Sequence, residues 1–208
     1  MPHLNRSIGN SHDRMARETE RFTSFKQHCF VEGKKEPKGD GLLIFDEVKV
    51  ISRLMWNSRS QKIIGLAMTP DDMSSLHDAY QLVNETSATR QTSYILQFIW
   101  RDLTSSFDVV GPYFCSSSQL ESKFIVACLL QTLRIFHLYG FHTCALVCDG
   151  ASANIAVLKS TCGTSGAYSV NSTSSDHYRV EPYFANPFDP ERKIFWVICP
   201  SHQVSLYS

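Results

Sequence analysis

The 208-residue sequence predicts an α/β fold with one mixed sheet, built in the order β-β-β-α-β-α-β. Short apolar runs rich in β-branched and aromatic residues, each bounded by turn residues, indicate strands. One longer apolar segment that ends at Gly140 indicates a buried helix. Because three strands precede that helix, the order favours an antiparallel meander that continues through parallel crossovers. A hydrophobic content of 43% is sufficient for a sizeable core.

The strand predictions follow the apolar runs in chain order. We expect strands over residues 42–55, 62–68, 92–101, 142–148 and 194–199. The first two flank a polar turn at 57–60 and are expected to pair as an antiparallel hairpin. Alternation along the first strand places Asp46 and Glu47 on opposite faces of the sheet.

Capping and breaking residues set the expected helices. Ser118 with Glu121 matches a capping box, which predicts a helix from there to Tyr139. A second helix is expected over residues 151–159. Residues 1–40 are polar and charge-mixed, and their apolar residues are too sparse for a core face, so we expect a flexible N-terminal extension before a domain over 41–208.

The composition narrows the classes of function. Lys plus Arg equals Asp plus Glu at 20 each, so any contact with nucleic acid would need a local basic patch. The seven cysteines lack C-x-x-C or zinc-finger spacing, which favours reduced thiols in an intracellular protein. No run approaches the ~18 apolar residues of a membrane span, so we expect no membrane partner.

Two aspartates follow apolar runs, Asp46 after residues 42–45 and Asp149 after 144–148. A carboxylate in a buried strand is costly without a partner. If these strands are neighbours, ~4.8 Å apart, the two carboxylates could share divalent cations. The alternatives are an exposed or lysine-paired Asp46, and an Asp149 that only caps the following helix.

This order of elements is the ribonuclease H-like arrangement, and parts of the chain resemble the catalytic domain of P-element-type transposases, a group that includes THAP-domain relatives. The similar segments are residues 43–50, 94–98 with 110–114, 147–154 and 194–202. The resemblance covers roughly residues 41–204, and the order and spacing of these segments carry it more than any single motif.

The resemblance implies a site, cofactors and partners. Asp46 and Asp149 match the first two metal-binding acids, with Mg²⁺ or Mn²⁺ as cofactor. Glu47, Asn154 and His202 are candidate accessory residues. Transposon-end DNA, a homo-oligomer and the nucleus are the implied partner, assembly and location.

The chain also departs from the family pattern. Cys199 stands where the family has aspartate. The family's GTP-binding insertion and the third acid after it are not present, so we expect a fold that is incomplete at the C-terminus. The later acids Asp176, Glu181, Asp189 and Glu191 fall in expected loops or turns, which disfavours a self-sufficient nuclease.

Two functions are therefore predicted. The first is a fragment of a transposase catalytic domain for metal-dependent phosphodiester cleavage and strand transfer, inactive in isolation because it lacks the third acid. The alternative is a non-catalytic, domesticated remnant that acts as a binding or assembly module.

Overall fold

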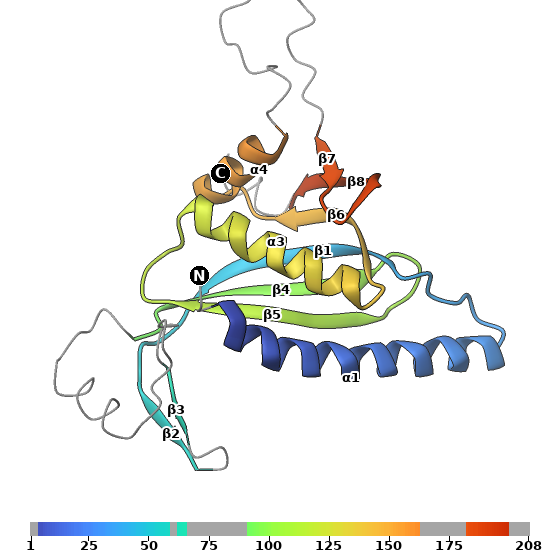
Figure 1. Ribbon diagram of the computed structural model, residues 1–208, viewed down its shortest axis with the longest axis horizontal. Helices are drawn as coiled ribbons and strands as arrows, with labels where there is room; N and C mark the ends of the chain where they lie inside the picture. The colour runs from blue at the N-terminus through green and yellow to red at the C-terminus, as the bar shows by residue number, and fades with distance from the viewer. Residues whose placement is uncertain (1–3, 59–61, 66–90, 163–181, 200–208) are drawn as a thin grey trace, which may run out of the picture.

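The computed structural model describes residues 4–58, 62–65, 91–162 and 182–199. The helices are α1 (Leu4–Val31), α3 (Ser122–Leu138) and α4 (Ser152–Cys162). The strands are β1 (Asp40–Lys49), β2 (Met55–Asn57), β3 (Lys62–Ile64), β4 (Tyr94–Asp102), β5 (Asp108–Ser116), β6 (His142–Cys148), β7 (Tyr183–Asn186) and β8 (Asp189–Ile198). Six of these strands form a mixed sheet in the order β5-β4-β1-β6-β8-β7 (Figure 1). The predicted α/β class is confirmed.

The sheet has an antiparallel half and a largely parallel half. β1, β4 and β5 form the meander, each antiparallel to its neighbour. β6 is parallel to β1 and follows α3 in the chain. β8 is parallel to β6, and α4 and β7 lie between these two strands in the chain. β7 adds an antiparallel edge strand to β8. An antiparallel meander followed by parallel strands is therefore observed, but its three strands are not the three that the sequence predicted.

The predicted hairpin between residues 42–55 and 62–68 is wrong. β1 ends at Lys49 and pairs with β4, while β2 and β3 form a separate two-stranded sheet. The third strand of the meander is β5, which the sequence analysis missed. Gly111 and Pro112 resemble turn residues, but they lie inside β5, where the pairing with β4 shifts register. A glycine and a proline at a bulge do not end a strand.

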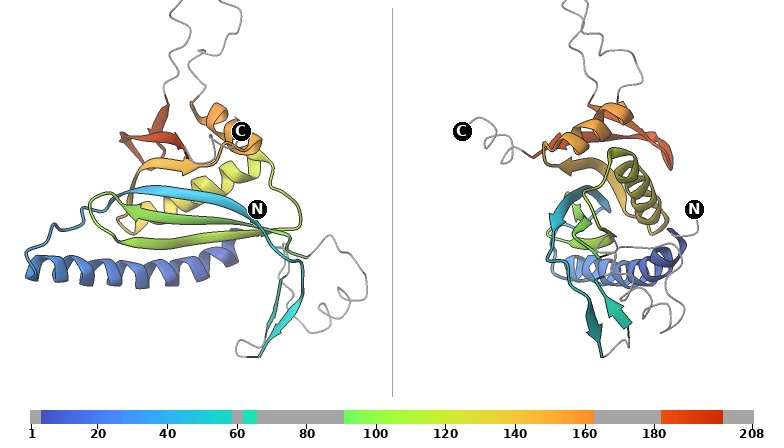
Figure 2. Two further views of the ribbon diagram at one scale, coloured as in Figure 1. Left: turned by 180° about the vertical axis from the view of Figure 1, so that it is seen from behind. Right: turned by 90° about the vertical axis from the view of Figure 1, so that its left-hand side faces the viewer.

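The core lies between the sheet and the helices on one of its faces (Figure 2). Its largest fully buried side chains include Phe45, Phe98, Trp100 and Phe136. α3 begins at Ser122, so the predicted capping box at Ser118 does not form. Glu121 occupies the N-cap position and makes no side-chain cap hydrogen bond.

Residues 4–31 form a helix that packs on this core, contrary to the expectation that the segment offers no core face. Met15 is fully buried, and Phe22 makes edge contacts with the rings of Trp100, Phe107 and Phe141. The expectation was wrong because it rested on the small number of apolar residues in this segment. A few aromatic side chains are enough to bury a large area.

The opposite face of the main sheet carries no helix among the described residues (Figure 2). Half-exposed apolar side chains lie on it: Val48, Val110, Tyr113, Phe195 and Val197. Other residues of the same face lie opposite them on neighbouring strands: Gln97 pairs with Tyr113, and Val147 pairs with Val197. We call this surface the open face.

Two further properties concern the whole described chain. None of its described helices is both long and apolar enough to cross a bilayer. No disulfide joins any of the seven cysteines, all of which lie in the described residues, and burial raises the pKa of Cys128 and Cys148 to about 12. Thiols with such a raised pKa are poor nucleophiles and act as packing groups here.

Candidate functional site

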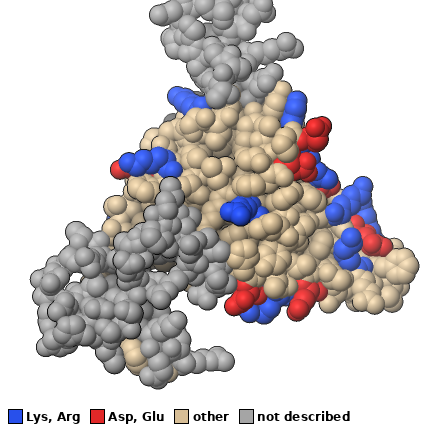
Figure 3. Space-filling model, in the orientation of Figure 1, with Lys and Arg blue, Asp and Glu red and all other residues tan. Residues whose placement is uncertain are grey.

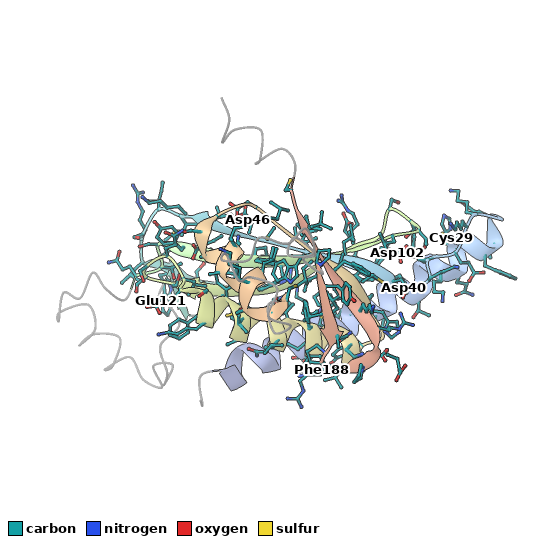
Figure 4. All side chains as sticks on the ribbon, turned by 90° about the horizontal axis from the view of Figure 1, so that it is seen from above. Cys29, Asp40, Asp46, Asp102, Glu121 and Phe188 are labelled. Carbon is teal, nitrogen blue, oxygen red and sulfur yellow. The ribbon has the colours of Figure 1, made fainter. Side chains whose placement is uncertain are left out.

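Asp46 lies near the end of β1 on the open face, on the side of the sheet away from α3 (Figure 4). The preceding residue, Phe45, is 1% exposed, whereas Asp46 is exposed to solvent. The sequence argument that this carboxylate is buried in its strand is therefore wrong. Alternation places Phe45 in the core and turns the next side chain outward, so water solvates the charge.

The register of two neighbouring strands brings Asp149 to the same region. β1 and β6 are parallel neighbours, as predicted, and Ile44 pairs with Val147. Asp46 lies two residues beyond that pair within β1, and Asp149 lies two residues beyond it, directly after β6 ends at Cys148. Backbones of neighbouring strands lie ~4.8 Å apart, so the two aspartates come to the same end of the sheet.

Hydrogen bonds at the start of α4 orient the Asp149 carboxylate. Its Oδ1 accepts the backbone N–H of Ala151 at 3.0 Å and the Nδ2 of Asn154 at 2.6 Å. Asn154 is 6% exposed, so its side chain is held in place by packing. Oδ1 of Asp149 therefore caps the start of α4, as the alternative predicted. Its Oδ2 has no hydrogen-bond partner among the described residues.

Asp46 has a similar division between its two oxygens. Its Oδ1 accepts the backbone N–H of Glu47 at 2.8 Å, and its Oδ2 has no partner in the described part of the chain. Within that part, no lysine or arginine forms an ion pair with Asp46 or Asp149. The lysine-paired alternative is therefore not observed for the described residues, and two carboxylates lie close together without a described counter-charge.

Glu47 reports on the proximity of both acids. Burial is the main cause that raises the pKa of its carboxyl; the N–H of Leu120 opposes that shift, and the charges of Asp46 and Asp149 add to it. The Glu47 side chain points to the α3 face, where Oε1 accepts the N–H of Leu120 at 2.9 Å. Glu47 therefore joins β1 to the segment that leads into α3, and strand alternation was correct in separating it from Asp46.

Replacing Glu47 with alanine is expected to destabilise the fold by about 1 kcal/mol, because the partly buried N–H of Leu120 loses its acceptor. Glu47→Gln keeps a carbonyl acceptor at the same place and should cost less. Urea unfolding of both variants measures the difference. Equal losses would show that the hydrogen bond to Leu120 is not what Glu47 contributes.

The remaining predicted residues do not join this site in the described structure. His202, Asp176 and Glu181 lie outside the described residues. Asp189 forms an ion pair with Arg192, which also binds Asp40. Asp40 lies toward the other end of the molecule from Asp46 (Figure 4).

Cys199 and Gln97 also lie beside the two acids. The backbone N–H of Cys199 donates to Cys148 O at 2.8 Å, so the end of β8 lies beside the end of β6. Gln97, which sequence reasoning missed, pairs with Asp46 across β1 and β4. Its Nε2 donates to the carbonyl oxygens of Gly111 and Pro112, at 3.1 and 3.3 Å. The available signal was a lone amide within an otherwise apolar strand.

The donor set suits a hard divalent cation. Each carboxylate is fixed through Oδ1 and presents an Oδ2 without a described partner, and carboxylate oxygen is the ligand that Mg²⁺ and Mn²⁺ prefer. The described residues bring only these two candidates together, because they contain no group of three or more His, Cys, Asp or Glu side chains placed to hold a metal. The arrangement therefore offers two protein ligands.

Comparisons with known proteins agree with this geometry. The family model described as TNP-like, RNase H N-terminal domain matches residues 17–161. The chain belongs to this family. The match begins inside α1 and ends inside α4, so it includes both aspartates and part of the helix that sequence analysis had set apart.

The TNP-like domain also resembles a solved structure, the Drosophila P element transposase strand transfer complex. The TM-score is 0.54 at 18% sequence identity, over 82% of this chain and 29% of that chain. At this identity the likeness establishes the fold, and the predicted ribonuclease H-like sheet is confirmed. The predicted resemblance to the ribonuclease H-like domain of P-element-type transposases is confirmed as well. A comparison with curated proteins gave no match.

Proposed function

We propose that this chain supplies the first two metal-binding acids of a DNA transposase catalytic domain. The reaction class is divalent-metal-dependent phosphodiester cleavage and strand transfer. The observation that supports it is the position of Asp46 near the end of β1 and of Asp149 directly after the neighbouring parallel strand β6, with one carboxylate oxygen each that has no partner among the described residues.

Each residue has a distinct role in this proposal. Asp46 and Asp149 would hold Mg²⁺ or Mn²⁺ through their Oδ2 atoms, and Asn154 with the Ala151 N–H would keep Asp149 oriented. A cation bound there would supply charge stabilisation for the attacking and leaving oxygens of a phosphodiester. Two acids give a weak site, so the isolated chain is expected to bind metal poorly and to leave DNA uncut.

Mn²⁺ binding tests this assignment without requiring activity. We expect Mn²⁺ to broaden the backbone amide NMR signals of Glu47 and Gly150 selectively in the wild-type chain. Asp46→Asn or Asp149→Asn should raise the Mn²⁺ concentration needed for that broadening about tenfold or more, because each removes a charged ligand.

Asp108→Asn is the matched control for the metal experiment. Asp108 is an acidic residue on the same sheet, but its carboxylate already accepts two hydrogen bonds from Arg101. It lies on the edge strand β5, which is not a neighbour of β6. In this variant the signals of Glu47 and Gly150 should broaden at the same Mn²⁺ concentration as in the wild-type chain. If Asp46→Asn and Asp108→Asn behave alike, the shared metal site is wrong, and the non-catalytic binding or assembly module becomes the better proposal.

The implied partners follow from the same proposal. The substrate would be transposon-end DNA, which places the protein in the nucleus during its reaction. Joining two transposon ends would require at least two copies of the catalytic domain, so we also propose a homo-oligomer.

A further inference from the structure

A small β arm leaves the main sheet at the end that carries Asp46. It comprises residues 50–65, of which 50–58 and 62–65 are described, and it contains β2 and β3. β1 ends at Lys49, only three residues after Asp46. The two strands form their own sheet and project away from the body of the domain (Figure 1). We call this element the β2–β3 arm.

The root of the arm is fixed to the main sheet. The N–H of Val50 donates to Ser93 O at 2.8 Å, and the hydroxyl of Ser52 donates to Thr92 O at 3.1 Å. On the returning strand, Gly65 O accepts the N–H of Thr92 at 2.8 Å. Gly65 has φ +100°, and a Cβ there would overlap the carbonyl oxygen of Arg53. Such a root sets the direction in which the arm projects.

The described surface of the arm is unusually apolar for an exposed element. Ile51 is 80% exposed, Met55 58% and Trp56 54%. The other two tryptophans, Trp100 and Trp196, are buried at 0% and 6%. Exposed large apolar side chains that cluster on one element mark a contact surface. Trp56 is thus the tryptophan that is available to a partner.

The charge of the same segment indicates which partner. Residues 48–65 contain Lys49, Arg53, Arg59 and Lys62 but no aspartate or glutamate, in a chain whose net charge is zero. On the face that carries α3, by contrast, most of the visible Lys and Arg side chains at the rim have Asp or Glu side chains beside them, and one basic side chain lies alone near the centre (Figure 3). Basic residues interleaved with an exposed aromatic fit a nucleic acid, whose phosphates pair with the cations and whose bases stack on the ring.

We propose that the β2–β3 arm binds the DNA that enters the carboxylate site, with Trp56 stacking on a base and Arg53 contacting the backbone. The identity of this DNA as a transposon end rests on the proposed function. The distance is compatible, because the ten residues from Asp46 to Trp56 span at most ~35 Å when fully extended. That length corresponds to ~10 steps of 3.4 Å along one strand.

Fluorescence anisotropy with defined DNA probes tests the arm. The probes are a fluorescein-labelled single strand of ~20 nucleotides of mixed sequence and the duplex of the same sequence, in ~50 mM NaCl. Trp56→Ala should weaken single-strand binding at least ~fivefold, because base stacking contributes strongly per base. Arg53→Ala should lower the slope of log affinity against log salt by about 1.

Matched controls come from the end of α1. Phe30 is a 71% exposed aromatic residue in the last turn of α1. Lys35 is an exposed lysine in the loop that follows this helix. Phe30→Ala and Lys35→Ala should leave both affinities unchanged. DNA should also quench the tryptophan emission of the wild-type chain and should leave that of Trp56→Ala largely unaltered. Because Trp56 is exposed, its variant should keep the wild-type unfolding midpoint.

Each outcome decides for or against the arm. Wild-type failure to bind either probe, or equal affinities of wild type and Trp56→Ala, rejects the proposal. A Trp56→Ala variant that changes self-association on a sizing column but not DNA affinity would reassign the arm to a protein interface. The Mn²⁺ experiment is independent of this one. If the chain binds Mn²⁺ but Trp56→Ala does not weaken DNA binding, the proposed function stands and the arm proposal fails. If Trp56→Ala weakens DNA binding but the chain does not bind Mn²⁺, only the DNA contact of the arm stands.

Discussion

Gly41→Ala is expected to destabilise the domain by about 3 kcal/mol or more, since it over-packs the contact between β1 and the buried ring of Trp100. Gly41 lies in β1, where an added Cβ would overlap the ring of Trp100 and the carbonyl oxygen of Arg101. Trp100 has no exposed surface and packs against Phe136 and Phe141, so it has no space into which to move. The clash therefore has to separate β1 from β4.

Urea unfolding followed by circular dichroism measures this loss, with Gly140→Ala as the control. Gly140 has φ +78° and nothing within 4 Å of an added Cβ, so its substitution strains the backbone without a clash. A cost of about 1 kcal/mol is expected for it. Comparable losses at the two glycines would contradict the close packing of Trp100 on β1.

Phe22→Ala is expected to cost about 3 kcal/mol, because it removes the ring through which α1 packs on the core. The ring centroid of Phe22 lies 5.0 Å from that of Phe107, 5.2 Å from Phe141 and 6.2 Å from Trp100. Truncation would leave a cavity bordered by three other aromatic rings, which cannot close without disturbing the sheet.

Phe30→Ala supplies the matched control, since it makes the same change on the same helix. Phe30 is 71% exposed, so its truncation should alter the free energy of unfolding by less than ~0.5 kcal/mol. Urea unfolding of both variants gives the comparison. If Phe22→Ala were as mild as Phe30→Ala, α1 would behave as the polar extension that the sequence suggested.

Part of the strand order was accessible from sequence because β6 and β8 each contain an uninterrupted apolar run. β6 and β8 could be recognised in this way, and their parallel pairing followed from the helices between them. β5 was not, because Gly111 and Pro112 interrupt it at a bulge. Local turn chemistry indicated a loop there, and the tertiary pairing with β4 prevailed.

The partner of β1 was misjudged for a different reason. Short loops are the commonest connections, so the next apolar run at 62–68 was taken as its neighbour. The β2–β3 arm is instead inserted in the chain between β1 and β4, and β1 pairs directly with Tyr94–Asp102. No local signal distinguishes an inserted hairpin from the next strand of a sheet.

For the site, the sequence indicated the two acids but not their surroundings. The positions of Asp46 and Asp149 after apolar runs predicted adjacent strand ends, which the register bears out. The solvent exposure of Asp46 and the hydrogen bond from Asn154 depend on where the helices lie, and composition carries no such information. Their role as metal ligands stays a prediction.

The central position of β1 also constrains the order in which the molecule can assemble. Its two neighbours are distant in the chain, since Ile44 pairs with Ile99 and with Val147, about 50 and 100 residues later. During synthesis, β1 would emerge from the ribosome long before either neighbour, with a row of unpaired backbone groups. Slow closure of these distant pairings is the expected kinetic bottleneck. Asp46 and Asp149 would come close together only at that late step.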